Sequence, residues 1–594
     1  MSSTVDPVTV SVIQHRLYAI VAEMGEAMLR TSYSQILNSS RDFSTAICDS
    51  RTRLVAQAEH VPIHVGAVPF AVRSVQEFFK GEIRPGDVYL LNDPYHGGNH
   101  LPDLTAFVPV FAGTEHLFWT IVRAHQSDIG GATHGAYNPA ATEIWQEGLR
   151  VTPLRLYDRG ELRRDVFDML AINVRHPRDF KGDLMASIGA ARNGERRLAQ
   201  LVKELGGAVV GAAVDAILDG AERQARAVVA TWKDGVYKGE AFLDDDGQGR
   251  TDVAIRAKIT KRGSDLEVDL TGSDPQCTGF VNSSHANMMS AVAMAFAFLI
   301  DPQTPRNEGT FRPLKVKAKP GTVVWCENNA PLTLCTSHCS NEIVEAMVRA
   351  IAPACPDRAM GGWGRRFRIA MKGKDPRTGK GFIWHLFHAR PGGGGTPFGD
   401  GWHSAGEWHS VGGLKFSSVE VAEVRFPLHF RRHEFRPDSA GDGQWRGGVG
   451  VDLDLVVEAE GETLGNTAGD GVRYGSAGIL GGQDSLPHRY VLHSKGRKPR
   501  VLKTKEVGIV IRPGDVLEVH SAGGGGWGDP RKRSAAARES DAENGLVTRR
   551  KPVSRAGAAS LRKGKPARKP ARPSVRKAAA KPARRLAAKS RSKR

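Results

Sequence analysis

One short loop of this sequence concentrates residues that can bind metals. Residues 92–107 read NDPYHGGNHLPDLTAF and contain Asp93, His96, His100 and Asp103, which are separated by glycine and proline. Imidazole nitrogens and carboxylate oxygens together are typical ligands of divalent transition metals. The same composition also occurs in ordinary solvated turns, so the loop alone leaves both interpretations open.

A His-x-x-Asp spacing occurs twice around this loop. His100 and Asp103 form the first pair, and His125 and Asp128 form the second, at the end of the hydrophobic run LFWTIV. A single strand-length segment separates the two pairs, and a reversal of the chain there could place them side by side. They would then form a site with two histidines, two carboxylates and room for water. Buried His and Asp also pair as hydrogen-bonded partners in protein cores. Further candidates upstream are Asp42, His60 and His64.

The elements that must position these residues are of mixed type. Apolar residues at spacings of three and four from Ile13 to Met28 predict a long helix, whereas residues 43–125 contain short β-rich runs broken by Gly and Pro. Strands and two helices, around 286–300 and 341–353, are predicted downstream. We therefore predict a mixed α/β (α+β), multi-domain fold. The expected parts are 1–235, a metal-bearing mixed α/β domain; 236–440, an α+β domain; 441–530, a β-rich lobe with glycine turns; and 531–594, a tail.

Glycine runs such as RPGGGGTPFGDG and SAGGGGWGDP could suggest phosphate binding, because clustered backbone amides can hold phosphates. The sequence contains no G-x-x-x-x-G-K-[ST] motif, however, and the first run leads into more loop rather than into a helix. We therefore expect these glycines to serve tight turns and close approach of backbones. Any ATP would be bound by another chain.

The formal net charge of +19 is confined to the C-terminal end. Residues 531–594 contain 23 Lys and Arg against 3 Asp and Glu, so the preceding residues carry a net charge of about −1. The tail should be disordered, because its Lys, Arg, Ala, Pro and Ser cannot bury enough apolar surface. It could contact nucleic acid or other polyanions without sequence preference, whereas the neutral body offers no basic face.

Cysteine usage and apolar runs indicate a cytoplasmic protein. Six cysteines in 594 residues do not make a disulfide scaffold, and neither a secretory signal nor a membrane-spanning run is present. Cys335, His338 and Cys339 could contribute to a zinc site, although no second Cys pair follows at finger spacing. Buried, inert thiols are the alternative.

Several stretches occur in the order expected of a known family. NDPYHGGNHLPD, AEHVPIHVG, EIWQEGLRVTPLRLY, RPDSAGDGQWRGGVG and GGGGWGDP resemble the hydantoinase B/oxoprolinase family over residues 8–531. This family includes the B subunits of ATP-dependent N-methylhydantoinases, the corresponding half of 5-oxoprolinase and related subunits of acetone-type carboxylases. The resemblance implies that an A-type partner subunit binds ATP and activates the substrate, while this chain carries a metal.

The resemblance also assigns roles to residues. It implies one divalent transition metal, with Mn, Zn and Fe all open, bound by Asp42, His100, Asp103 and His125. Asp128, His134 and Glu147 become candidate catalytic residues. His60, His64, Asp93 and His96 become candidates for contact with the ligands or the substrate. Family members commonly carry Glu-Arg before the RDFS motif, where this chain has Ser39 and Ser40, so the identity of the substrate stays open.

The implied activity is hydrolytic opening of a small cyclic amide or imide, of the hydantoin or oxoproline type, after activation by the ATP-binding partner. An ATP-dependent ketone carboxylase of the acetone or acetophenone type is the alternative among enzymes. From a different class, a nucleic-acid-associated protein acting through its basic tail is the third possibility.

Overall fold

The β-rich region predicted from 43 to 125 forms most of a seven-stranded sheet in the computed structural model, which describes residues 5–58 and 60–548. Neighbouring strands are antiparallel throughout, in the order β2-β1-β5-β4-β3-β6-β7. The strands are β1 (Phe43–Asp49), β2 (Leu54–Ala58), β3 (Val88–Leu91), β4 (Asp103–Ala112), β5 (Glu115–His125), β6 (Leu154–Asp158) and β7 (Glu161–Leu162).

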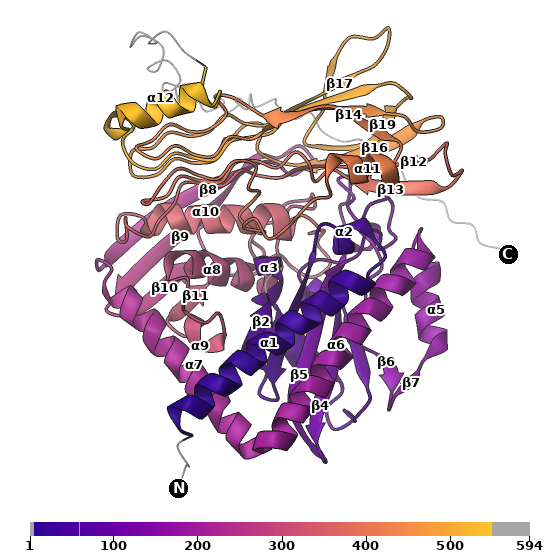
Figure 1. Ribbon diagram of the computed structural model, residues 1–594, viewed down its shortest axis with the longest axis vertical. Coiled ribbons are helices and arrows are strands. Elements are labelled where there is room, and N and C mark those ends of the chain that lie inside the picture. The colour runs from indigo at the N-terminus through magenta and orange to yellow at the C-terminus, as the bar shows by residue number, and fades with distance from the viewer. Residues whose placement is uncertain (1–4, 59, 549–594) are drawn as a thin grey trace, which may run out of the picture. The chain divides into compact units, whose positions relative to one another are not determined.

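Helices cover both faces of this sheet. The predicted N-terminal helix is α1 (Pro7–Thr31), which lies beside α6 (Pro177–Leu205) along one face (Figure 1), and α4 (Val68–Phe78) covers the other. Successive strand residues point to opposite faces, so Phe107 packs toward α4 and Val108 packs into the core beneath α1 and α6. The other helices of this region are α2 (Gln35–Asn38), α3 (Pro62–Val65), α5 (Arg164–Ile172) and α7 (Gly207–Ala230).

A second sheet and a buried helical layer follow in the chain. The sheet has the order β11-β10-β9-β8, and Gly239 of β8 packs directly against the backbone of α10 (Ser340–Ile351). Both helices predicted for this region are present, and no helix in the described part of the chain is long and apolar enough to cross a membrane. The elements are β8 (Gly235–Asp245), β9 (Thr251–Arg262), β10 (Asp265–Asp269), β11 (Leu314–Lys317), α8 (His285–Leu299) and α9 (Glu308–Phe311).

Two further sheets enclose the C-terminal core. Their orders are β13-β12-β16-β19 and β14-β15-β20-β17-β18, and one apolar cluster lies between them. In each of these sheets, strands from before and after residue 440 pair directly: β12 with β16 in one sheet and β14 with β15 in the other. The domain boundary expected at 440/441 therefore falls inside both sheets. The elements are β12 (Phe367–Lys374), β13 (Gly381–His385), α11 (Val419–Arg425), β14 (Leu428–Phe435), β15 (Val451–Val457), β16 (Thr463–Gly469), β17 (Arg489–His493), β18 (Arg500–Val501), β19 (Lys505–Ile511) and β20 (Val516–His520).

The glycine runs form a layer of extended backbones rather than a phosphate loop. Gly361 N donates to Gly395 O at 2.8 Å, Gly395 N donates to Gly525 O at 2.9 Å, and Gly525 N donates to Gly362 O at 2.8 Å. A Cβ at Gly394 or Gly524 would collide with a carbonyl oxygen of the neighbouring segment. Close backbone approach, as expected from the sequence, is therefore the reason for these glycines.

The chain end from 531 to 548 is ordered, contrary to the expectation that disorder begins at 531. Helix α12 (Ala535–Glu543) follows a short 3-10 turn at Pro530–Lys532. Its Asp541 is buried and pairs with Arg446 at 3.0 Å and with Arg533 at 2.7 Å, which anchors the segment. The rest of the predicted tail, 549–594, lies outside the described residues, as does most of the charge on which polyanion contact was expected.

Two truncations should therefore differ in stability. Removing residues 549–594 should leave the melting temperature unchanged. Removing residues 534–594 should lower the free energy of unfolding by about 3 kcal/mol, because buried Arg446 loses Asp541 as its partner. Thermal denaturation of both truncated forms beside the full chain measures the difference, and equal melting temperatures would show that α12 contributes nothing to the fold.

Candidate metal centre

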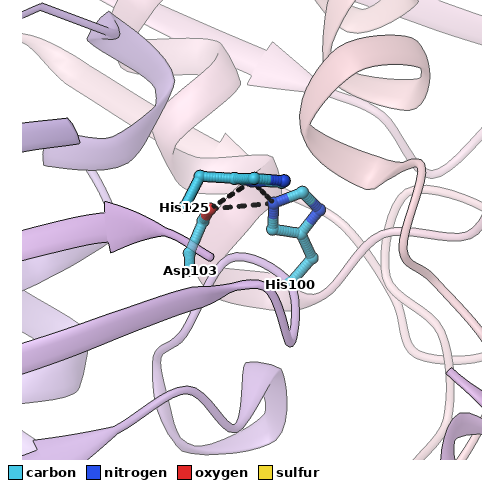
Figure 2. Close-up of side chains that lie close together, drawn as sticks. All are labelled: His100, Asp103 and His125. Atoms are coloured by element: carbon cyan, nitrogen blue, oxygen red, sulfur yellow. Dashed lines mark hydrogen bonds and ion pairs between the residues drawn. The ribbon is translucent and has the colours of Figure 1, made fainter. Parts of the chain in front are cut away.

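Three buried side chains bring ligand-type atoms together (Figure 2). His100 Nε2 lies 2.9 Å from Asp103 Oδ1 and 3.2 Å from His125 Nδ1, and His125 Nδ1 lies 3.1 Å from Asp103 Oδ1. Within 5–58 and 60–548, this is the group of three His, Cys, Asp or Glu residues whose ligand atoms all lie within 4.8 Å of one another. We call it the His–Asp cluster.

The β4–β5 hairpin explains how the cluster forms. Asp103 opens β4, His125 closes β5, and the two residues are direct partners across the antiparallel pair. His100 lies on the preceding loop, in a turn in which Asp103 N donates to His100 O at 3.0 Å. The strand-length excursion between the two His-x-x-Asp pairs therefore returns the chain to its starting edge, as the spacing predicted.

Burial and mutual contacts shift the pKa values of the three cluster residues in different directions. His100 Nδ1 donates to the Thr333 carbonyl at 2.6 Å, which leaves Nε2 facing the other two side chains. Burial alone would raise the pKa of Asp103, but the His100 and His64 imidazoles hold that pKa well below its ordinary value. Burial lowers the pKa of His125, so its ring is neutral. Burial disfavours the charged form of His100, but the Asp103 carboxylate raises the pKa of His100 above its ordinary value, so a metal would displace the proton that Nε2 shares with Asp103. Without that proton, one carboxylate and two imidazole nitrogens converge, which fits the expected ion.

Asp42 and His64 border the cluster. His64 Nε2 lies 3.4 Å from Asp103 Oδ2 and 3.7 Å from Asp42 Oδ1. The backbone carbonyl of Asp42 accepts a hydrogen bond from His125 N at 3.0 Å. The structure therefore brings together three of the four expected ligands. The fourth, Asp42, lies on the other side of His64, whose Nε2 is near both Asp42 and Asp103. The expected contact of His64 with the ligands is present.

Glu147 supports His100 through the backbone. Its carboxylate is fully buried and accepts hydrogen bonds from Leu332 N at 3.0 Å and from Thr333 N at 2.8 Å. The Thr333 carbonyl in turn holds His100 Nδ1. Burial raises the pKa of Glu147 to about 7. The geometry makes this carboxyl a positioning group two steps from the cluster, whereas the sequence suggested an acid or base in the cleft.

Glu147→Gln should weaken metal binding about 10-fold, because an NH2 group in place of Oε2 would face the Leu332 N–H donor and shift the segment whose Thr333 carbonyl orients His100. Competition with a metal-sensitive dye measures the affinity. The matched control is Glu143→Gln, an exposed carboxyl on the same loop, and it should bind metal like the unaltered chain. Equal affinities for the two variants would contradict the positioning role.

Asp128 and His134 lie outside the cluster. Asp128 Oδ1 pairs with Arg175 at 2.9 Å, and its Oδ2 accepts from Arg175 N at 2.9 Å, so this carboxylate anchors the loop to the segment before α6. His134 Nε2 contacts Ala370 O at 3.4 Å, and burial lowers the pKa of His134 to about 4. Asp128 is therefore engaged by Arg175 and does not join the cluster, although the second His-x-x-Asp pair was expected to lie beside the first.

The remaining candidates, Asp93, His96 and His60, make contacts within the 92–107 loop and the nearby core. Asp93 Oδ2 lies 2.8 Å from His96 Nδ1 and accepts from Arg150 Nε at 2.8 Å. His60 packs its ring on Phe43, with 4.5 Å between the ring centroids. None of Asp93, His96 and His60 reaches the His–Asp cluster as the described residues are arranged.

Three residues near the cluster were not among the candidates predicted from the sequence. Tyr137 stacks on His125 with 5.8 Å between ring centroids, and the Arg368 guanidinium lies 3.8 Å from the Tyr137 ring centroid. Neither residue has a spacing that links it to the motif. Arg123 is fully buried and donates to Thr105 Oγ1 at 2.8 Å and to the carbonyl of His64 at 2.9 Å. An arginine inside an apolar strand was a signal that the sequence did offer.

The hydrogen bonds of His338 argue against a zinc site at Cys335, His338 and Cys339. His338 Nε2 donates to Arg366 O at 3.1 Å, and its Nδ1 lies 2.9 Å from Ser337 Oγ, so both ring nitrogens are used. Cys335 and Cys339 are buried free thiols. The interpretation as inert core thiols therefore agrees with the structure.

Across the described residues, the fold and the cluster define a large mixed α/β protein with four sheets and an enclosed polar centre. The crystal structure of ATP-dependent caprolactamase from Pseudomonas jessenii has this fold, with a TM-score of 0.86, 32% identity, and coverage of 92% of this chain and 95% of that chain. A nucleotide-free acetone carboxylase structure shares the fold at 19% identity, with a TM-score of 0.83 and coverage of 92% and 78%.

Residues 6–530 match the hydantoinase B/oxoprolinase family, and the chain belongs to that family. The caprolactamase subunit beta of Pseudomonas jessenii is 33% identical over 557 residues, which cover 92% of this chain and 95% of that protein. The family inferred from the sequence motifs is thereby confirmed.

Proposed function

We propose that this chain is the metal-bearing B-type subunit of an ATP-dependent amidohydrolase that opens a cyclic amide or imide. The convergence of His100 Nε2, Asp103 Oδ1 and His125 Nδ1 in one buried cluster carries the proposal. Membership of the hydantoinase B/oxoprolinase family and the similarity to a caprolactamase subunit support a cyclic amide as the substrate class.

The cluster would hold one divalent transition metal, Mn, Zn or Fe, with Asp42 as a fourth ligand from the position beside His64. Such an ion lowers the pKa of bound water and polarises carbonyl groups. Thr333 fixes the orientation of His100, and His64 restrains the Asp103 carboxylate. Tyr137 stacks on His125, and its buried ring would help to keep bulk water away from the cluster.

ATP would be used by an A-type partner subunit. An amide carbonyl is stabilised by resonance and is a poor electrophile, so phosphorylation of its oxygen by the partner would activate the ring for attack by water. The glycine-rich segments of the described chain hydrogen-bond to one another and therefore do not form a phosphate-binding loop.

Reconstitution with the partner tests the proposal. The chain should be inactive alone, and the complex should hydrolyse ε-caprolactam, hydantoin or 5-oxoproline with ATP and without bicarbonate. Activity on a ketone that requires bicarbonate would establish the carboxylase alternative instead. Hydrolysis of ATP and opening of the cyclic amide by the isolated chain would contradict the need for a partner.

A further inference from the structure

Four buried carboxyl groups and two buried cations lie where the second sheet and α10 contact the C-terminal sheet β13-β12-β16-β19. Charged groups away from water are expected to be paired, so an excess of two negative charges in this place would be costly. We call this set the junction network. Its members are Asp244 of β8, Glu342 and Glu345 of α10, Arg365 before β12, Asp470 after β16, and Lys505 of β19.

Three of the four carboxyl groups have donors on their oxygen atoms. Arg365 donates from Nε to Glu342 Oε1 at 2.8 Å, and its terminal nitrogen donates to Glu342 Oε2 at 2.7 Å and to Glu345 Oε1 at 3.1 Å. The Asp244 carboxylate accepts from Val472 N at 2.7 Å and from the two backbone amides that follow. Hydrogen bonds of this kind stabilise the charged form of a carboxyl group.

Asp470 differs from these three. Its Oδ1 accepts from Asp244 N at 2.7 Å and from Gly471 N at 3.1 Å, but its Oδ2 is buried and has no hydrogen-bond partner among the described residues. The Lys505 ammonium lies 3.9 Å from Oδ2 and donates instead to Gly469 O at 2.9 Å. A buried oxygen without a partner costs less on a neutral carboxyl group than on a carboxylate.

The groups that face Asp470 favour its neutral form. Burial and the Asp244 carboxylate hold the pKa of Asp470 well above its ordinary value; Lys505 opposes this shift, and Glu342 adds to it. Lys505 is itself shared, because Asp245 Oδ2 lies 3.6 Å from its ammonium. The negative groups around Asp470 therefore outweigh the positive ones.

His488 supplies no compensating charge. Its Nε2 donates to Arg365 O at 2.6 Å, and burial lowers the pKa of His488 to about 4, so the ring is neutral. We infer that Asp470 is a neutral carboxyl group at neutral pH, and that the junction network is a pH-sensitive contact between the second sheet and the C-terminal sheet, which loosens when Asp470 loses its proton. The inference is independent of the proposed catalysis.

Loss of the proton would leave a carboxylate without a partner beside the carboxylate of Asp244, and the two belong to different sheets. The pKa of an aspartate in the unfolded chain is about 4. Because the pKa in the folded protein is higher, the stability that Asp470 contributes is fully present below about pH 4 and is lost as the pH rises toward the folded-state pKa.

Thermal unfolding of the full-length chain between pH 5 and pH 9 tests the inference. Asp470→Asn is neutral at every pH, so its melting temperature should rise relative to that of the unaltered chain as the pH increases, to a difference of at least about 3 °C at pH 9. Asp470→Ser is a second neutral replacement and should show the same trend if the Asn variant does not fold. Asp357→Asn alters an exposed aspartate and should melt like the unaltered chain at each pH.

Infrared spectroscopy at pH 7 detects the proton directly. The unaltered chain should show a neutral-carboxyl band that is absent from Asp470→Asn. At pH 9, backbone amides of β8 and β16 should exchange hydrogen about 10-fold faster in the unaltered chain than in the variant, because the contact between the two sheets is looser. Equal infrared bands, or a melting-temperature difference that does not change with pH, would overturn the inference, because Asp470 would then be ionised in the folded protein.

Discussion

His100→Ala is expected to reduce the bound divalent metal from about one ion per chain to less than about 0.1, with the fold retained. The imidazole supplies one of three converging ligand atoms, and the Thr333 carbonyl fixes its orientation. His125→Ala should have the same effect, because Nδ1 of His125 is equally part of the cluster. Elemental analysis after gel filtration in metal-free buffer measures the occupancy, and circular dichroism monitors the fold.

The control for this experiment is His96→Ala. His96 belongs to the same loop as His100, but its ring is half exposed and contacts Asp93 instead of the cluster. It should keep the full metal content. Full occupancy in both His100→Ala and His125→Ala would show that the ligand set is wrong, and loss of metal in His96→Ala would place the site elsewhere on the loop.

Gly524→Ala is expected to destabilise the protein by more than about 4 kcal/mol. The new Cβ would collide with the carbonyl oxygen of Gly393, and the collision is with backbone that is itself hydrogen-bonded to neighbouring segments. A flexible side chain could move aside, whereas this backbone cannot without breaking the layer. Denaturant unfolding, or the soluble yield if the variant does not fold, measures the effect.

Gly399→Ala provides the comparison within the same glycine-rich region. A Cβ at Gly399 meets nothing within 4 Å, and its backbone does not adopt a positive φ. This variant should be as stable as the unaltered chain. If Gly524→Ala unfolds at the same denaturant concentration as Gly399→Ala, the close backbone approach at Gly524 does not contribute to stability.

The sequence alone determined the core of the candidate site. The strand-length separation of the two His-x-x-Asp pairs allowed them to return side by side, and the antiparallel hairpin that forms places its first and last residues opposite each other. Asp103 and His125 are therefore neighbours because of local chain geometry. The long amphipathic helix α1 follows from apolar periodicity in the same way, and the buried helix α8 follows from a continuous apolar run.

The partners of that site were decided by tertiary structure. Thr333 orients His100, and Arg368 reaches Tyr137, across more than two hundred residues of chain, so no local pattern contains these contacts. Asp128 shares its spacing with Asp103, yet Arg175 engages it, because the loop after β5 turns toward α6 and away from the cluster. Spacing specifies which residues return to one sheet edge. Which side chains then meet there depends on how distant segments pack against that edge, and this is settled by the burial of apolar surface over the whole chain.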